Sequence, residues 1–187
     1  MKHLKVLLLA LFAVQLAVPG YMIFEQHQIL SKGTVYKFKT QPIDPYDPFR
    51  GRYVTLAYNV DANPIPTKEV FQRGDWAYAL LSEDEDGYAT FTQLVSEEPE
   101  AGQEYIEVEI SWGGTNRGHY IDLPFDRYYA SEETAPNIER AVWRRDQVED
   151  VYAEISVLNG KATLKELYVE DLPIREYLEQ KASQAEE

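Results

Sequence analysis

The sequence contains no cysteine and only three histidines, His3, His27 and His119. Without cysteine the chain cannot form a disulfide, carry a lipid on a thiol, bind zinc through thiolates or use a cysteine nucleophile. The histidines are isolated in the sequence, so they form no cluster of the kind that binds zinc. We therefore expect no metal site and no cofactor.

Basic residues are scarce after the amino terminus. Residues 25–187 contain 16 Lys and Arg against 32 Asp and Glu, which gives this part of the chain a net charge of −16. Such a domain repels nucleic acid and anionic lipid headgroups. Nucleic-acid binding is therefore set aside as a function.

One long apolar run extends from Val6 to Phe24, and its 19 residues would cover roughly 28 Å as a helix, close to the thickness of a bilayer core. Lys2 and Lys5 precede the run and Glu25 follows it. By the positive-inside rule, the amino terminus faces the cytoplasm and the rest of the chain lies outside. We expect a single-pass anchor in the inner (cytoplasmic) membrane over residues 1–24, then a connector over residues 25–33.

A cleaved signal peptide is the alternative for this segment, because Leu4 to Val18 also resembles the apolar region of such a peptide and Pro19-Gly20 can stop a helix. Cleavage needs small residues in an A-x-A spacing, and only Val18-Pro19-Gly20 is tolerable. A retained anchor is therefore preferred. A buried core helix fits less well, since the run is apolar on every face.

The remainder consists of short segments in which apolar and polar residues alternate, separated by turns, and the 14 Tyr of the chain suit half-buried strands. The Asn159-Gly160 pair is typical of a two-residue hairpin turn, and the acidic Ser82 to Gly87 segment reads as the tip of another hairpin. We predict a mainly β domain over residues 34–172, an antiparallel sandwich or partly open barrel, and a polar helical tail over 173–187. The predicted strands are 34–39, 52–60, 75–82, 88–95, 104–112, 119–123, 148–158 and 161–169, with one internal helix at 136–145.

The densest chemical constellation lies in the proline-stiffened loop from Asp44 to Tyr53. In a structural interpretation, Asp44 and Asp47 cap the turn and Arg50 pairs with one of them. In a functional interpretation, the same residues line a pocket or surface for a polar ligand. The candidate binding residues are Asp44, Asp47, Phe49, Arg50, Gly51, Tyr53, Tyr58, Arg127 and Tyr128.

Residues 42–58, with Asp44-Pro45-x-Asp47-Pro48, Arg50-Gly51-x-Tyr53 and Leu56-x-Tyr58, resemble the signature of the GDYXXLXY family. The resemblance continues in Arg127-Tyr128-Tyr129, with Glu132 shortly after. It implies a membrane-associated protein of unassigned function that accompanies multi-pass membrane proteins. Arg52 stands where the family name has Asp, so this chain lacks that acid as a ligand or base.

Other motifs are weaker. Glu83 to Gly87 lacks the oxygen spacing of a calcium loop, and Gly113 to Gly118 lacks the lysine and helix of a phosphate-binding loop. Adjacent Ser31 and Lys32 would point apart in an extended segment, which argues against a serine-lysine peptidase. No Gly-x-Ser-x-Gly element is present.

These features favour a membrane-anchored, periplasmic, non-enzymatic accessory or interaction domain that partners a multi-pass membrane protein. The alternative is a hydrolase or small-ligand-binding domain that uses the Asp44 and Asp47 carboxylates. The two interpretations differ in the depth of the site. A closed polar pocket around Asp44, Asp47 and Arg127 would favour the small-ligand site. A flat exposed patch of Tyr46, Phe49 and Tyr128 would favour a protein partner.

Overall fold

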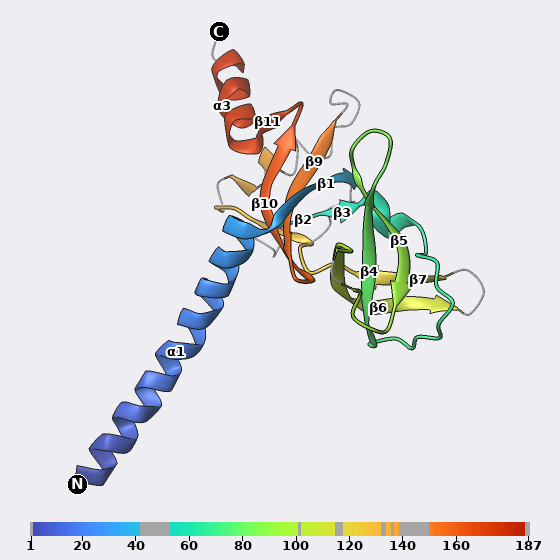
Figure 1. Cartoon of the computed structure of the whole chain (residues 1–187). Helices are drawn as coiled ribbons and strands as arrows, with labels where there is room; N and C mark the ends of the chain where they lie inside the picture. Colours follow the sequence, from blue (N-terminus) through green and yellow to red (C-terminus); the bar gives the residue numbers. More distant parts are fainter. Residues whose placement is uncertain are drawn as a thin grey trace.

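A computed structural model of the chain describes residues 2–41, 53–100, 102–114, 118–131, 134–135, 137–138 and 150–185. A long helix, α1 (Lys2–Lys32), projects from a β domain, and a short helix, α3 (Ile174–Ala185), follows the last strand (Figure 1). Both termini lie at the ends of helices, well apart from each other (Figure 1). The predicted polar helical tail is thus present.

Helix α1 is longer than the apolar run. It continues through Pro19 and includes the segment 25–32, so Pro19-Gly20 does not stop it and the expected connector is helical. The side chains from Leu7 to Phe24 are exposed, and the apolar window of α1 is not buried by the rest of the described chain. Ser31 also lies in the helix, with its hydroxyl donating to the His27 carbonyl at 2.7 Å, so the extended segment assumed for Ser31 and Lys32 is wrong.

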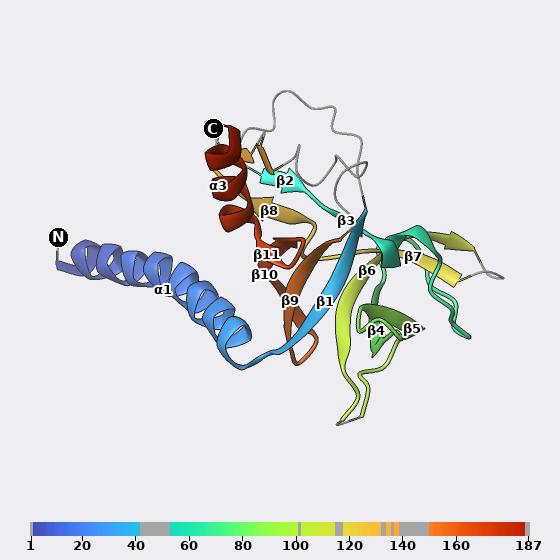
Figure 2. The ribbon, with the colours of Figure 1, turned by 90° about the horizontal axis from the view of Figure 1, so that it is seen from above.

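The domain is a curled, antiparallel half-barrel, which confirms the predicted mainly β fold. A five-stranded sheet has the order β11-β10-β9-β1-β3, a four-stranded sheet has the order β5-β4-β6-β7, and β2 pairs with β8 alone. Figure 2 shows the two larger sheets side by side, with β1 running from the end of α1 across the domain. The strands are β1 (Thr34–Gln41), β2 (Tyr53–Thr55), β3 (Ala57–Tyr58), β4 (Trp76–Glu83), β5 (Ala89–Val95), β6 (Tyr105–Gly114), β7 (Gly118–Asp122), β8 (Arg127–Tyr129), β9 (Val151–Leu158), β10 (Lys161–Val169) and β11 (Leu172–Pro173).

The predicted hairpins are confirmed. Strands β9 and β10 are joined by Asn159 and Gly160, whose φ angles of 50° and 77° are those of a two-residue turn with two left-handed residues. Strands β4 and β5 pair about the acidic tip, where Asp84 accepts hydrogen bonds from the backbone of Asp86 and Tyr88. The turn chemistry visible in the sequence therefore sets the register of both hairpins.

The segment 52–60 is not the single strand that its alternation predicts. Val54, Leu56 and Tyr58 all face the core, but β2 pairs with β8, whereas β3 pairs with β1 through Thr40 and Tyr58. A 3-10 helix, η1 (Asn59–Ala62), follows directly. The break falls at Leu56, whose N–H donates instead to the Asp126 carbonyl at 2.7 Å.

An aromatic cluster joins the sheets in the core. The ring of Phe38 on β1 lies 5.9 Å from Tyr58, 5.9 Å from Phe91 on β5 and 5.2 Å from Phe125, measured between centroids. Each of these side chains is at most 8% exposed. Burial of one such side chain stabilises the fold by about 1.5–3 kcal/mol, and favourable ring pairs add about 0.5–1.5 kcal/mol. The cluster therefore fixes the relative position of β1, β3 and β5.

The predicted internal helix at 136–145 lies mostly outside the described residues. Ala135, Asn137 and Ile138 are helical, and Ile138 is buried. Helix α3 packs through Ile174 and Tyr177, which are buried, and leaves its polar residues exposed. This amphipathic pattern holds α3 against the end of the five-stranded sheet.

Candidate functional site

The candidate site is built on the two-stranded ribbon of β2 and β8. Tyr53 pairs with Tyr129, Val54 with Tyr128, and Thr55 with Arg127. Since successive side chains of a strand point to opposite faces, Tyr53, Arg127 and Tyr129 share one face and Val54 and Tyr128 share the other. The ribbon thus brings together three of the predicted site residues, Tyr53, Arg127 and Tyr128, from distant parts of the sequence.

The outer face of the ribbon is aromatic and cationic. The Arg127 guanidinium lies over the Tyr53 ring, 5.1 Å from its centroid, and the rings of Tyr53 and Tyr129 are 6.0 Å apart. Tyr129 is 68% exposed, and Arg127 is paired only loosely with Asp126, at 3.6 Å between Nε and Oδ1. A hydrogen bond to Tyr129, and then the charge of Asp126, raise the pKa of Arg127, so it stays charged. We call Tyr53, Arg127 and Tyr129 the ribbon face.

Tyr128, on the opposite side of the ribbon, is buried at 8% exposure. Its hydroxyl donates to Glu166 Oε1 on β10 at 3.2 Å, and the same oxygen accepts the N–H of Leu167. Burial, and then the Glu166 charge, raise the pKa of Tyr128, and Arg175 acts in the opposite direction. Tyr128 therefore does not belong to an exposed patch, because strand alternation exposes its neighbours Arg127 and Tyr129 instead.

A groove of about 500 Å³ adjoins the ribbon on the side of α3. Tyr128, Tyr129 and Ile138 line one wall, and Arg175, Leu178 and Ala182 of α3 are among the residues of the other. The lining also includes polar and charged side chains: Ser131, Thr134, Asn137, Arg175 and Glu179.

Leu56 and Tyr58 hold the ribbon in place from the core. The Leu56 N–H donates to the Asp126 carbonyl at 2.7 Å, and the Tyr58 hydroxyl donates to the Phe125 carbonyl at 2.9 Å. Both side chains are buried, at 3% and 0% exposure. Two consecutive carbonyls just before Arg127 are thereby fixed, so these residues position β8 beside β2. Tyr58, predicted as part of the binding surface, lies in the core.

The other candidate residues, Asp44, Asp47, Phe49, Arg50 and Gly51, lie outside the described residues, as do Tyr46, Arg52 and Glu132. Sequence reasoning missed Tyr129, Glu166 and Arg175 as neighbours of the site. The period-two pattern could have found Tyr129, because it must share a face with Arg127. No local sequence pattern indicated Glu166 and Arg175, because their contacts with Tyr128 depend on the order of the strands and on the position of α3.

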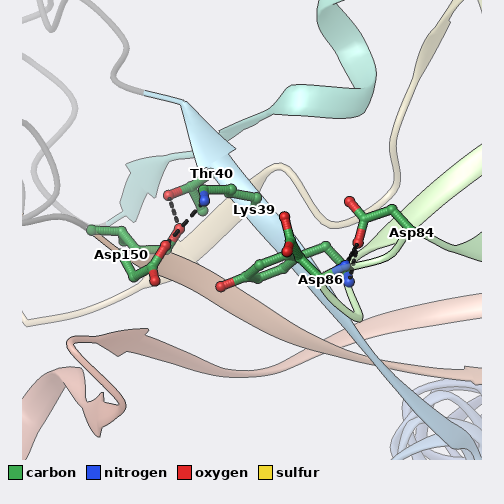
Figure 3. A network of polar contacts seen from close by, with 7 residues as sticks. Lys39, Thr40, Asp84, Asp86 and Asp150 are labelled. Atoms are coloured by element: carbon green, nitrogen blue, oxygen red, sulfur yellow. Dashed lines mark hydrogen bonds and ion pairs between the residues drawn. The ribbon is translucent and has the colours of Figure 1, made fainter.

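A second polar cluster lies where β1 approaches the β4–β5 turn (Figure 3). Lys39 pairs with Asp150 at 3.0 Å and lies over the Tyr88 ring, 5.0 Å from its centroid. The adjacent Thr40 hydroxyl donates to the Val151 carbonyl at 2.9 Å. Burial, and then the Asp150 charge, raise the pKa of Tyr88. A shallow cleft of about 180 Å³ opens beside Lys39 and Tyr88.

Within the residues that the structure describes, no group of three or more His, Asp or Glu side chains is arranged to hold a metal ion. Asp84, in the acidic tip, already closes its own turn by accepting two backbone N–H groups. His119 is buried at 3% exposure, packs edge-on against Phe71 and belongs to β7 of the four-stranded sheet, not to the β2–β8 ribbon.

Comparison with known proteins gives one match. The family model described as GDYXXLXY protein matches residues 15–167, from the middle of α1 to β10. No curated protein and no solved structure matches the chain. The matched range contains the second half of α1, the aromatic core cluster and the β2–β8 ribbon.

Proposed function

Because the chain belongs to the GDYXXLXY protein family, whose function is unassigned, we propose that it is a membrane-anchored accessory protein whose β domain docks on a multi-pass membrane protein. The observation that carries the proposal is the ribbon face, where Arg127 and Tyr129 are exposed beside the half-buried Tyr53 and are held in position by buried hydrogen bonds. Tyr and Arg are the residue types enriched where protein interfaces concentrate their binding energy.

Helix α1 supports the anchoring part of the proposal. Its stretch from Leu7 to Lys32 is long and apolar enough to cross a bilayer, and its apolar window is not covered by the described domain. A helix that is apolar on all sides and not covered by protein exposes its side chains unfavourably to water, and a surrounding bilayer stabilises it. Lys2 and Lys5 before the apolar run and Glu25 after it favour a cytoplasmic amino terminus and a periplasmic domain.

Chemistry of the ribbon face supports docking rather than catalysis. Arg127 and the two tyrosines on this face offer hydrogen-bond donors and aromatic surface, with no described nucleophile and general base held together beside them. The alternative of a hydrolase or small-ligand site depends on Asp44 and Asp47, which lie outside the described residues. No described residue favours it.

A pull-down in gentle detergent from the native membrane tests the proposal. The full-length protein is compared with the double variant Arg127→Ala, Tyr129→Ala and with a control, Trp112→Ala. Trp112 on β6 is 69% exposed and packs beside Tyr120 on β7, and both strands belong to the four-stranded sheet. The control therefore removes an exposed aromatic residue from a sheet other than the β2–β8 ribbon. We expect a multi-pass protein to co-purify with the wild type and the control and to be lost with the double variant. Equal recovery with all three would contradict docking through the ribbon face.

A further inference from the structure

The last turns of α1 lie against the β9–β10 hairpin. The Ser156 hydroxyl on β9 donates to the Ile29 carbonyl at 2.7 Å, and both residues are buried. Nearer the apolar run, the Gln26 amide donates to the Thr163 hydroxyl, and Lys161 forms an ion pair with Glu25. Three residues in the last turns of the helix, Glu25, Gln26 and Ile29, are thus bonded to one hairpin, with α1 beside β10 (Figure 1).

The junction between α1 and the domain leaves no room for a flexible linker. Gly33 is the one residue between α1 and β1, and its N–H continues the helix by donating to the Ile29 carbonyl at 2.9 Å. Thr34 then pairs at once with Val157 of β9. A Cβ atom on Gly33 would lie 2.4 Å from Ser156 Oγ and 2.6 Å from the Ile29 carbonyl oxygen. The close approach of helix and hairpin therefore requires glycine here.

These contacts set the level of the hairpin relative to the apolar run. Glu25 is the first residue after that run, and its partner Lys161 is the first residue of β10, directly after the Asn159-Gly160 turn. The turn therefore lies at the level where the apolar run ends. At this turn Asn159 is an exposed amide, Lys161 pairs with Glu25, and Glu107 packs beside Gly160, to whose carbonyl its N–H donates at 2.8 Å.

We propose that the tip of the β9–β10 hairpin is the membrane-contacting edge of the domain and lies in the polar headgroup layer, with α1 and the domain joined as one rigid unit. The proposal rests on the anchoring role proposed above. The exposed Asn159 amide and the paired Lys161 can contact zwitterionic headgroups, whereas the acidic surface of the domain is repelled by anionic lipids. The ribbon face is then presented to its partner in one fixed orientation.

The absence of native cysteine makes the rigid junction directly testable. In the full-length protein, reconstituted in phosphatidylcholine vesicles, the pair Gln26→Cys, Thr163→Cys is expected to be joined by a short thiol-to-thiol cross-linker, since the Gln26 amide reaches the Thr163 hydroxyl. The matched control pair His27→Cys, Thr163→Cys places the first cysteine one residue further along, about 100° around the helix. Cross-linking of the first pair alone supports the junction, and equal or absent cross-linking of both overturns it.

Glycine substitutions give a second readout of the junction. Gly33→Ala in the Gln26→Cys, Thr163→Cys background is expected to reduce the cross-linking rate at least several-fold, because the new methyl group pushes the hairpin away. Gly20→Ala is the control, since a Cβ atom there has nothing within 4 Å. If Gly33→Ala cross-links as fast as Gly20→Ala, the junction is not tightly packed and the proposal fails.

Contact with the headgroups is measured with a fluorophore on Asn159→Cys in vesicles that carry a headgroup-attached quencher. The control label is on Glu85→Cys, at the exposed β4–β5 tip beside Lys39, near the end of β1 remote from α1. Strong quenching at position 159 and weak quenching at 85 are expected, and equal quenching overturns the membrane contact. Carbonate extraction of wild-type protein from native membranes separates the two proposals, because release means that the anchor is wrong whatever the cross-linking result.

Discussion

The hydroxyl of Tyr58 donates a 2.9 Å hydrogen bond to the carbonyl of Phe125, two residues before the exposed Arg127. Tyr58 is fully buried, and its ring also packs against Phe125 at 5.3 Å between centroids. The last tyrosine of the family signature is thus a core residue that holds the Arg127-Tyr128-Tyr129 segment. The segment from Leu56 to Tyr58 and the segment 125–129 are thus physically joined.

Tyr58→Phe should lower the free energy of unfolding by about 1–3 kcal/mol, because the Phe125 carbonyl loses a buried hydrogen-bond donor. Chemical denaturation of the detergent-solubilised protein measures the change. Tyr129→Phe is the control, and its exposed hydroxyl should contribute less than about 0.5 kcal/mol. A Tyr58→Phe protein as stable as the control would show that this bond does not hold the segment.

The variants Thr40→Val and Lys39→Met compare how much stability a buried and a partly exposed polar contact contribute at adjacent positions of β1. Thr40 is 2% exposed and donates to the Val151 carbonyl, so its loss should cost about 1–3 kcal/mol. The ion pair of Lys39 with Asp150 is partly exposed and should contribute less than about 1 kcal/mol. Thermal unfolding of both variants measures the loss of stability, and a larger loss of stability for Lys39→Met than for Thr40→Val would contradict this ranking.

The strand positions could be predicted because turn residues such as Asn159-Gly160 and the alternation in β4, β5, β6 and β9 are local signals. The break at Leu56 could not, since it depends on the Asp126 carbonyl, which the fold supplies from a distant part of the chain. Likewise, alternation places Arg127 and Tyr129 on one face, but only the sheet order brings Tyr53 beside them and Glu166 beneath Tyr128. The bonds from α1 to the β9–β10 hairpin have no local signal either.

Gly160→Ala should destabilise the fold more than Gly87→Ala. Both glycines have positive φ angles, 77° and 80°, so each alanine costs about 1–2 kcal/mol in backbone strain. A Cβ atom on Gly160 would also lie 2.5 Å from the Tyr105 ring, whereas one on Gly87 would have nothing within 4 Å. Equal losses in denaturation experiments would show that packing at the hairpin tip is looser than described.

Alkaline pH should destabilise the protein partly through Tyr105. Its hydroxyl donates to Glu98 at 2.7 Å, and this bond is the main cause that raises the pKa of Tyr105 to about 12. The folded state therefore keeps a proton that the unfolded state loses near pH 10, so stability present below pH 10 is lost between pH 10 and about 12. Denaturant midpoints across this range should fall less steeply for Tyr105→Phe, and identical slopes would contradict the assignment.

Docking through the ribbon face is tested most directly by site-specific photo-cross-linking in the native membrane. A photoreactive phenylalanine analogue replaces Tyr129, and a second protein carries it at Trp112 as the control. The account predicts a discrete adduct with a multi-pass membrane protein from position 129 and none from position 112. No adduct from position 129, or the same adducts from both positions, would contradict the ribbon face as the docking surface.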